Sequence, residues 1–137
     1  MKSCTFFGHR DTPSEIKPHL KSTLIDLIEN YDVAMFYMGS EGSFDAMALS
    51  VVRELKLVYP HIDYVVVLAY LPKNPNQDYT HTIYPEEVAK SHPRYAISKR
   101  NRYMIEKSGF VIYYVKYSFG GAYKIYSLAN KKRQGDN

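Results

Sequence analysis

Apolar runs alternate with amphipathic stretches along most of this 137-residue chain. Four stretches are short and almost wholly apolar, which is typical of strands covered on both faces. They are residues 3–7, 33–38, 64–70 and 110–115. The stretches between them place apolar side chains every three or four positions, as amphipathic helices do. This alternation predicts an α/β fold around a mainly parallel sheet of about four strands.

A strand is joined to a helix by a glycine-containing turn within residues 33–55. Backbone N–H groups at the start of a helix and the helix dipole both favour an anion such as a phosphate. The turn is therefore a candidate phosphate site, although a tight turn without a ligand also explains its glycines. The candidate residues are Gly39, Ser40, Glu41, Gly42 and Asp45.

A second strand, loop and helix begin the chain. Residues 3–7 lead into Gly8, His9 and Arg10, and a capping box with Thr12 as N-cap, Pro13 and Glu15 is expected to start the helix. Pro18 then falls in the first helical turn, and the apolar face comprises Ile16, Leu20, Leu24, Leu27 and Ile28. An arginine beside a glycine at a strand end is well placed to bind a phosphate. A surface ion pair between Arg10 and Asp11 is the alternative.

Residues 71–95 interrupt the alternation with four prolines. A loop of this length in a small domain is usually functional or disordered, so we expect a lid or a subunit contact. His81 and His92 lack the close spacing of metal ligands, and no metal site is expected. Tyr70, just before the loop, is a candidate to cover a base.

A further helix is expected over residues 96–108, where Ile97 and Met104 define the inner stripe and Arg100 and Asn101 share it. A buried arginine needs a partner, because an isolated charge is costly to desolvate. That partner is either Asp45 or Glu41, or the phosphate of a ligand.

The last strand leads to Gly120 and Gly121, after which a helix is expected over about residues 122–132. This would be a third strand–glycine–helix unit, and it would leave one edge of the sheet bare. With the first strand central, the ligand crevice would lie between the loops after the first and fourth strands. All three glycine loops would converge there.

Composition adds a few constraints. The chain fits one domain with a polar tail at 133–137, and its 18 basic against 14 acidic residues suit a small anionic ligand. The dense basic cluster, Lys131–Arg133, could bind nucleic acid, but basic residues at the end of a helix also interact favourably with its dipole. The single Cys4 and the lack of a membrane-length apolar run or signal-peptide pattern predict a cytoplasmic protein.

Several motifs together resemble the SLOG superfamily, which includes the DprA, LOG and YpsA-like proteins. They are CTFFGHR, MGSEGSFDAMALSVVRELK, ISKRNRYMIEKS and FGGAYK, in the expected order over nearly the whole chain. The resemblance implies a Rossmann-like three-layer sandwich with helices on both faces, a nucleotide-type ligand at the glycine loops, and a homo-oligomer. The matching positions are Gly8, His9, Arg10, Gly39, Gly42, Asp45, Arg100, Asn101, Gly120 and Gly121.

One departure from the family decides between binding and catalysis. The enzymatic LOG group carries a catalytic glutamate where this chain has Ser127, and serine cannot stabilise an oxocarbenium ion. We therefore expect a module that binds a nucleotide or nucleotide-derived molecule. The first alternative is an N-glycosidic-bond-cleaving enzyme using Glu41, Asp45 or His9. The second is DprA-like nucleic-acid binding.

Overall fold

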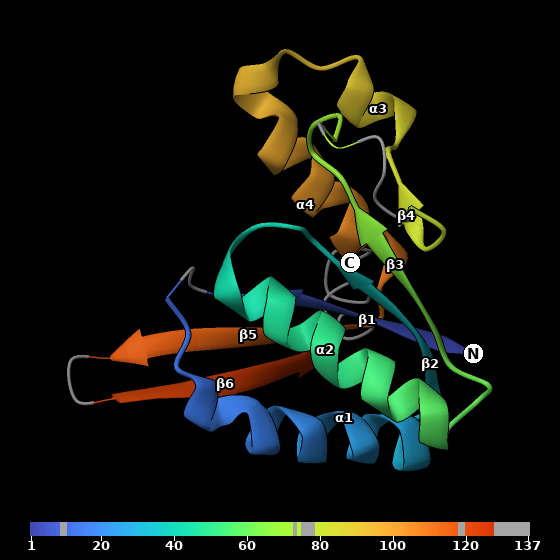
Figure 1. The fold of residues 1–137 in the computed structure, drawn as a ribbon, viewed down its shortest axis with the longest axis vertical. Helices are drawn as coiled ribbons and strands as arrows, with labels where there is room; N and C mark the ends of the chain where they lie inside the picture. Colours follow the sequence, from blue (N-terminus) through green and yellow to red (C-terminus); the bar gives the residue numbers. More distant parts are fainter. Residues whose placement is uncertain (9–10, 73, 75–78, 118–119, 128–137) are drawn as a thin grey trace, which may run out of the picture.

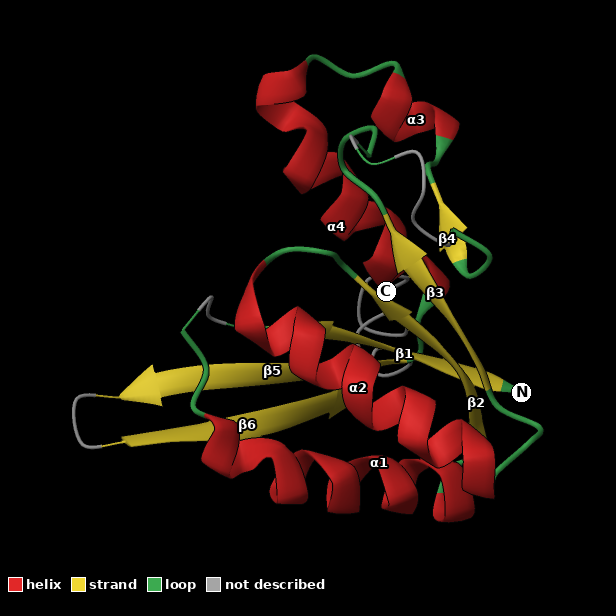
Figure 2. Cartoon of the chain, viewed as in Figure 1, coloured by secondary structure: helices red, strands yellow, loops and turns green. Residues whose placement is uncertain are grey.

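The computed structural model describes residues 1–8, 11–72, 74, 79–117 and 120–127, with side chains described up to Tyr114. Within these residues six strands form one sheet in the order β4-β3-β2-β1-β5-β6 (Figures 1 and 2). β1 to β5 are parallel, and β6 runs antiparallel to β5. The strands are β1 Lys2–Phe7, β2 Val33–Met38, β3 Asp63–Val67, β4 Thr82–Ile83, β5 Phe110–Tyr117 and β6 Gly120–Ser127.

Helices cover both faces of this sheet. α1 and α2 lie side by side on one face, and α4 lies on the other (Figure 1). The helical segments are η1 Ser14–Ile16, α1 Lys17–Asn30, α2 Gly42–Val58, α3 Glu86–Ala89, η2 Pro93–Tyr95 and α4 Ala96–Lys107. The predicted α/β class, with a mainly parallel sheet and helices on both faces in a Rossmann-like sandwich, is confirmed.

Aromatic side chains fill the core between the sheet and α1 and α2. The Phe6 ring stacks on Phe36 with centroids 6.0 Å apart and meets Phe44 edge-on at 6.5 Å. Phe44 in turn stacks on Tyr114 at 6.0 Å. All four residues are almost fully buried, so this cluster ties the start of α2 to the central strands.

The start of the first helix differs from the prediction. Pro13, rather than Thr12, occupies the N-cap position of a 3₁₀ turn, and α1 begins at Lys17 with Pro18 in its first turn, as expected. The Thr12 backbone N–H instead donates to Ser43 Oγ at 2.7 Å. This tertiary hydrogen bond joins the loop after β1 to the first turn of α2.

The segment 71–95 contains short elements in the part that the structure describes. β4 extends the sheet beyond β3, and α3 packs against α4. Val88 and Ala96 form a small buried cluster with Ala69, against which Tyr84 and Ile97 pack. The segment therefore carries the chain from β3 to the start of α4 and sets where α4 lies.

The predicted third strand–glycine–helix unit is wrong. Gly120 and Gly121 are the first residues of β6, in register with Tyr117 and Lys116 of β5. Residues 122–127 continue that strand, and 128–132 lie outside the described residues. The edge of β5 is therefore covered by β6, its partner in a hairpin, and the two glycines are not at a helix N-terminus.

Candidate functional site

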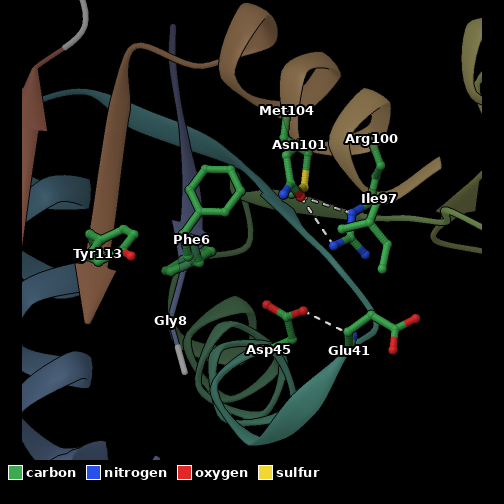
Figure 3. A pocket seen from close by; sticks show the side chains of 10 residues that line it. Phe6, Gly8, Glu41, Asp45, Ile97, Arg100, Asn101, Met104 and Tyr113 are labelled. Atoms are coloured by element: carbon green, nitrogen blue, oxygen red, sulfur yellow. Dashed lines mark hydrogen bonds between the residues drawn. The ribbon is translucent and has the colours of Figure 1, made fainter. Parts of the chain in front are cut away.

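The strand order reverses at β1: the chain adds β2, β3 and β4 on one side of it and then returns to place β5 on the other side. In open α/β sheets this is where ligands bind, outside the carboxyl ends of the strands. A cavity of about 320 Å³ lies there, between β1, the start of α2, and α4 (Figure 3). Its polar lining comprises Glu41, Asp45, Arg100 and Asn101, and its apolar lining includes Phe6, Ile97, Met104 and Tyr113.

Arg100 is the cation of this cavity. It lies on α4 and is 4% exposed, and its Nε and Nη2 donate to Asn101 Oδ1 at 3.3 and 3.2 Å. Its Nη1 is buried and has no hydrogen-bond partner among the described residues. Burial lowers the pKa of Arg100, and the charges of Asp45, Glu41 and Tyr70 raise it. The arginine thus keeps one desolvated donor unsatisfied.

Gly39 allows Arg100 and Asp45 to approach the end of β2 together. A Cβ at position 39 would lie 2.7 Å from Arg100 Nη1 and 2.8 Å from Asp45 Oδ2, closer than real Cβ contacts. Within the part of the chain that the structure describes, no direct ion pair joins Arg100 to Asp45. The guanidinium and the carboxylate therefore both approach Gly39 on the side where another residue would carry its Cβ.

Asp45 lies in the first turns of α2, and its Oδ2 accepts a hydrogen bond from the Glu41 N–H at 3.0 Å. Burial raises the pKa of the Asp45 carboxyl to about 6. The Glu41 N–H and the Arg100 charge oppose this rise, and the Glu41 carboxylate adds to it. Gly42, which begins α2, has a φ of 82°, which suits glycine at this sharp entry to the helix.

Asp45→Asn is expected to stabilise the protein at neutral pH. The pKa of Asp45 is about 6 in the folded protein and 3.8 ordinarily. The protonated carboxyl therefore contributes to the free energy of unfolding fully below about pH 4, and this contribution is lost as the pH rises through 6. At about 1.4 kcal/mol per pKa unit, the ionised carboxylate costs roughly 3 kcal/mol. We expect urea unfolding to show a gain of roughly 2 kcal/mol at pH 7.5 and little change at pH 4.

The exposed Asp11 offers a matched control, because Asp11→Asn removes the same charge from a carboxylate that folding does not bury. It should leave the free energy of unfolding nearly unchanged at both pH values. A gain for Asp45→Asn that is equally large at pH 4 would contradict the titration argument.

A second cavity, of about 550 Å³, adjoins the first and shares Glu41 and Asp45 with it. It lies between α2 and the segment after β3. Tyr70 is 44% exposed there, and its hydroxyl donates to the Pro93 carbonyl at 3.1 Å. Apolar side chains of Leu49, Val66, Leu68, Leu71 and Pro72 form much of its wall.

The two cavities gather most of the predicted site residues. Gly8, Arg100 and Asn101 line the first, and Glu41 and Asp45 line both. The second contains Gly39, Ser40, Gly42 and Tyr70. His9 and Arg10 lie outside the described residues. Gly120 and Gly121 pair with β5 beyond Tyr113, the last β5 residue in register with β1, so they do not form the third glycine loop expected at the crevice.

Arg53 is a lining residue that the sequence reasoning missed. It borders the second cavity, and its Nε donates to the Tyr64 hydroxyl at 3.3 Å. The spacing could have indicated this, because Gly42, Ala46, Leu49 and Arg53 are separated by four, three and four residues along α2. Those positions share the face of the helix that borders this cavity.

Fold and site together define an α/β protein of Rossmann-like architecture with a charged crevice where the strand order reverses. No protein-family model and no curated protein matches the chain. Among the described residues, no helix is long and apolar enough to cross a membrane, and no group of three or more histidine, cysteine or acidic residues could hold a metal ion.

Proposed function

We propose that this protein binds a nucleotide or a nucleotide-derived molecule, with the anionic group against Arg100 and the N-terminus of α2. One observation carries the proposal: Arg100 lines the first cavity and is 4% exposed, and its buried Nη1 has no hydrogen-bond partner among the described residues. A buried charged donor left unsatisfied is costly, and a phosphate oxygen would satisfy it. The start of α2 adds favourable potential on the opposite wall.

The remaining groups suit the rest of such a ligand. Carboxylates accept hydrogen bonds from sugar hydroxyls, as acidic residues do in other dinucleotide-binding sheets, and Glu41 and Asp45 stand where the two cavities meet. The apolar wall of the second cavity and the exposed ring of Tyr70 suit a flat heterocycle. A phosphate, a sugar and a base would thus each meet a fitting surface.

The motif resemblance supports the same proposal. Gly8, Gly39, Asp45, Arg100 and Asn101, which match SLOG motifs, lie around the two cavities. We therefore propose membership of the SLOG superfamily, with the cytoplasmic location and homo-oligomeric assembly that the resemblance implies. The β5–β6 hairpin and Ser127 depart from the LOG pattern and favour binding over LOG-type catalysis.

Cleavage of an N-glycosidic bond is the second candidate function. The observation that favours it is the pair Glu41 and Asp45 in one cavity, with the pKa of Asp45 raised to about 6 by burial. A carboxyl that titrates near neutral pH can act as a general acid, while a second carboxylate stabilises the oxocarbenium-like transition state.

A thermal-shift panel of nucleoside mono-, di- and triphosphates, NAD and ADP-ribose tests both candidates, with each incubation analysed for released base. A ligand at about 100 times its Kd adds roughly 2.7 kcal/mol, which moves the Tm by several degrees. We expect a shift without base release. Base release that Glu41→Gln abolishes would establish the second candidate instead, and a panel without any shift would contradict both.

A further inference from the structure

We infer that Asp45 takes up a proton when an anion enters the first cavity, so that the site binds its anionic ligand together with a proton. The inference rests on the proposed function and adds the regulation of that same site by pH. It begins from geometry: Arg100 Nη1 and Asp45 Oδ2 both lie within 2.8 Å of the place that a Cβ of Gly39 would occupy. An anion bound to Nη1 therefore comes close to the Asp45 carboxylate.

Repulsion from the carboxylates of the described lining opposes such an approach, and the removal of one negative charge reduces it. Among the described residues that line the first cavity, Arg100 from α4 is the cation, and Glu41 and Asp45 from the β2–α2 turn are the anions. Tyr70, in the segment after β3, also acts on Arg100. His9 and Arg10, which follow Gly8, lie outside the described residues. Of these described side chains, an incoming anion meets two carboxylates beside one guanidinium.

Asp45 is better placed than Glu41 to lose its charge. Its Oδ2 lies beside the position at Gly39 that Arg100 Nη1 also approaches, and burial already raises its pKa to about 6. Its Oδ2 accepts the Glu41 N–H at 3.0 Å, while Oδ1 makes no hydrogen bond to a described residue. Figure 3 shows that second oxygen turned into the cavity, away from Glu41.

Proton uptake would convert a repelling group into a donor. Water supplies the proton, Oδ1 carries it, and the resulting O–H donates to the anion while Oδ2 keeps its hydrogen bond from Glu41. The negative charge of Asp45 is removed as the ligand enters, so one unit of the charge of the ligand is offset. Carboxyls held neutral by their surroundings act as donors elsewhere in this way.

Sodium sulfate is the probe that tests the inference, because its charge stays constant between pH 6 and pH 8. Isotope-labelled protein would be titrated at both pH values, at ionic strength matched with sodium chloride, with the methyl signals of Ile97 and Met104 as local reporters. We expect the affinity for sulfate to be about tenfold higher at pH 6 than at pH 8. The ¹³C signal of the Asp45 carboxyl should titrate at a higher pH in sulfate than in chloride.

Variants identify the group responsible. Asp45→Asn should bind sulfate equally well at pH 6 and pH 8, and at pH 8 more tightly than the wild type. Glu41→Gln and His9→Gln should each retain the pH dependence. Histidine titrates in the same range, so a dependence that survives in Asp45→Asn and disappears in His9→Gln would overturn the inference.

The failure of the inference and that of the proposed function are distinguishable. Saturable sulfate binding with equal affinity at pH 6 and pH 8 in the wild type would overturn proton uptake and leave the anion site standing. If the signals of Ile97 and Met104 do not respond to sulfate at either pH, the anion site itself is refuted, and proton uptake with it.

Discussion

Arg100→Met is expected to weaken anion binding strongly while the protein stays folded. Removing a desolvated charged donor from a binding site typically costs 2–5 kcal/mol of binding, so sulfate or a nucleotide should bind roughly 100-fold more weakly. Methionine is close to arginine in length, and Arg100 has no directly paired carboxylate among the described residues. Replacing such a charge with an apolar side chain should change the free energy of unfolding by less than about 1 kcal/mol.

The measurement is a binding titration beside urea unfolding, with Arg102→Met as the matched control. Arg102 lies on the same helix, is exposed, and changes the net charge of the protein equally. It should leave both affinity and stability near the wild-type values. If Arg100→Met instead lost several kcal/mol of stability and still bound the anion, Arg100 would be a structural residue rather than a ligand residue.

Gly39→Ala is expected to disrupt the same site from the backbone. The new methyl group would overlap Arg100 Nη1 and Cζ, at 2.7 and 2.9 Å, and Asp45 Oδ2, at 2.8 Å. All three atoms are near the ends of side chains, so the chain can fold with these groups displaced, at an overpacking cost of about 1–3 kcal/mol. Because both charged groups move, affinity for the anion should fall at least about tenfold.

Gly109→Ala is the matched control for this substitution. A Cβ at Gly109 would meet nothing closer than the Ser3 carbonyl oxygen at 3.7 Å, which is an ordinary contact. Binding should therefore be unchanged in Gly109→Ala. Equal affinities of Gly39→Ala and the wild type would show that the anion does not depend on the arrangement of Arg100 and Asp45 around this glycine.

The central part of the fold follows from local patterns. Strands β1, β2, β3 and β5 contain mostly apolar runs, and α2 and α4 have clear helical periodicity, so their type could be predicted and their ends placed to within a few residues. The central place of the first strand and the crevice beside it also followed, because parallel strands joined by helices permit few topologies. Asp45 was predicted as one possible partner of Arg100, beside Glu41 or a ligand phosphate, because a buried arginine is costly to leave unpaired.

The error after Gly120 shows where local patterns stop being sufficient. Residues 120–127 were expected to begin a helix by analogy with the two earlier glycine turns. Their sequence, with Tyr123, Ile125 and Tyr126, is equally compatible with a strand. Backbone pairing with β5 makes the segment a strand, with Tyr123 in register with Tyr114 and Ile125 in register with Ile112. Such pairing depends on a partner segment and cannot be seen in the segment itself.

The sequence by itself determined the class of fold, the order of its central strands and the chemical types that meet at the crevice. Only the tertiary structure decided how those groups are arranged. It left Arg100 Nη1 without a partner among the described residues, placed Asp45 Oδ2 on the same side of Gly39 as that nitrogen, and added a second cavity bordered by Arg53. Burial and close approach arise from packing between segments distant in sequence, so no local pattern of residues encodes them.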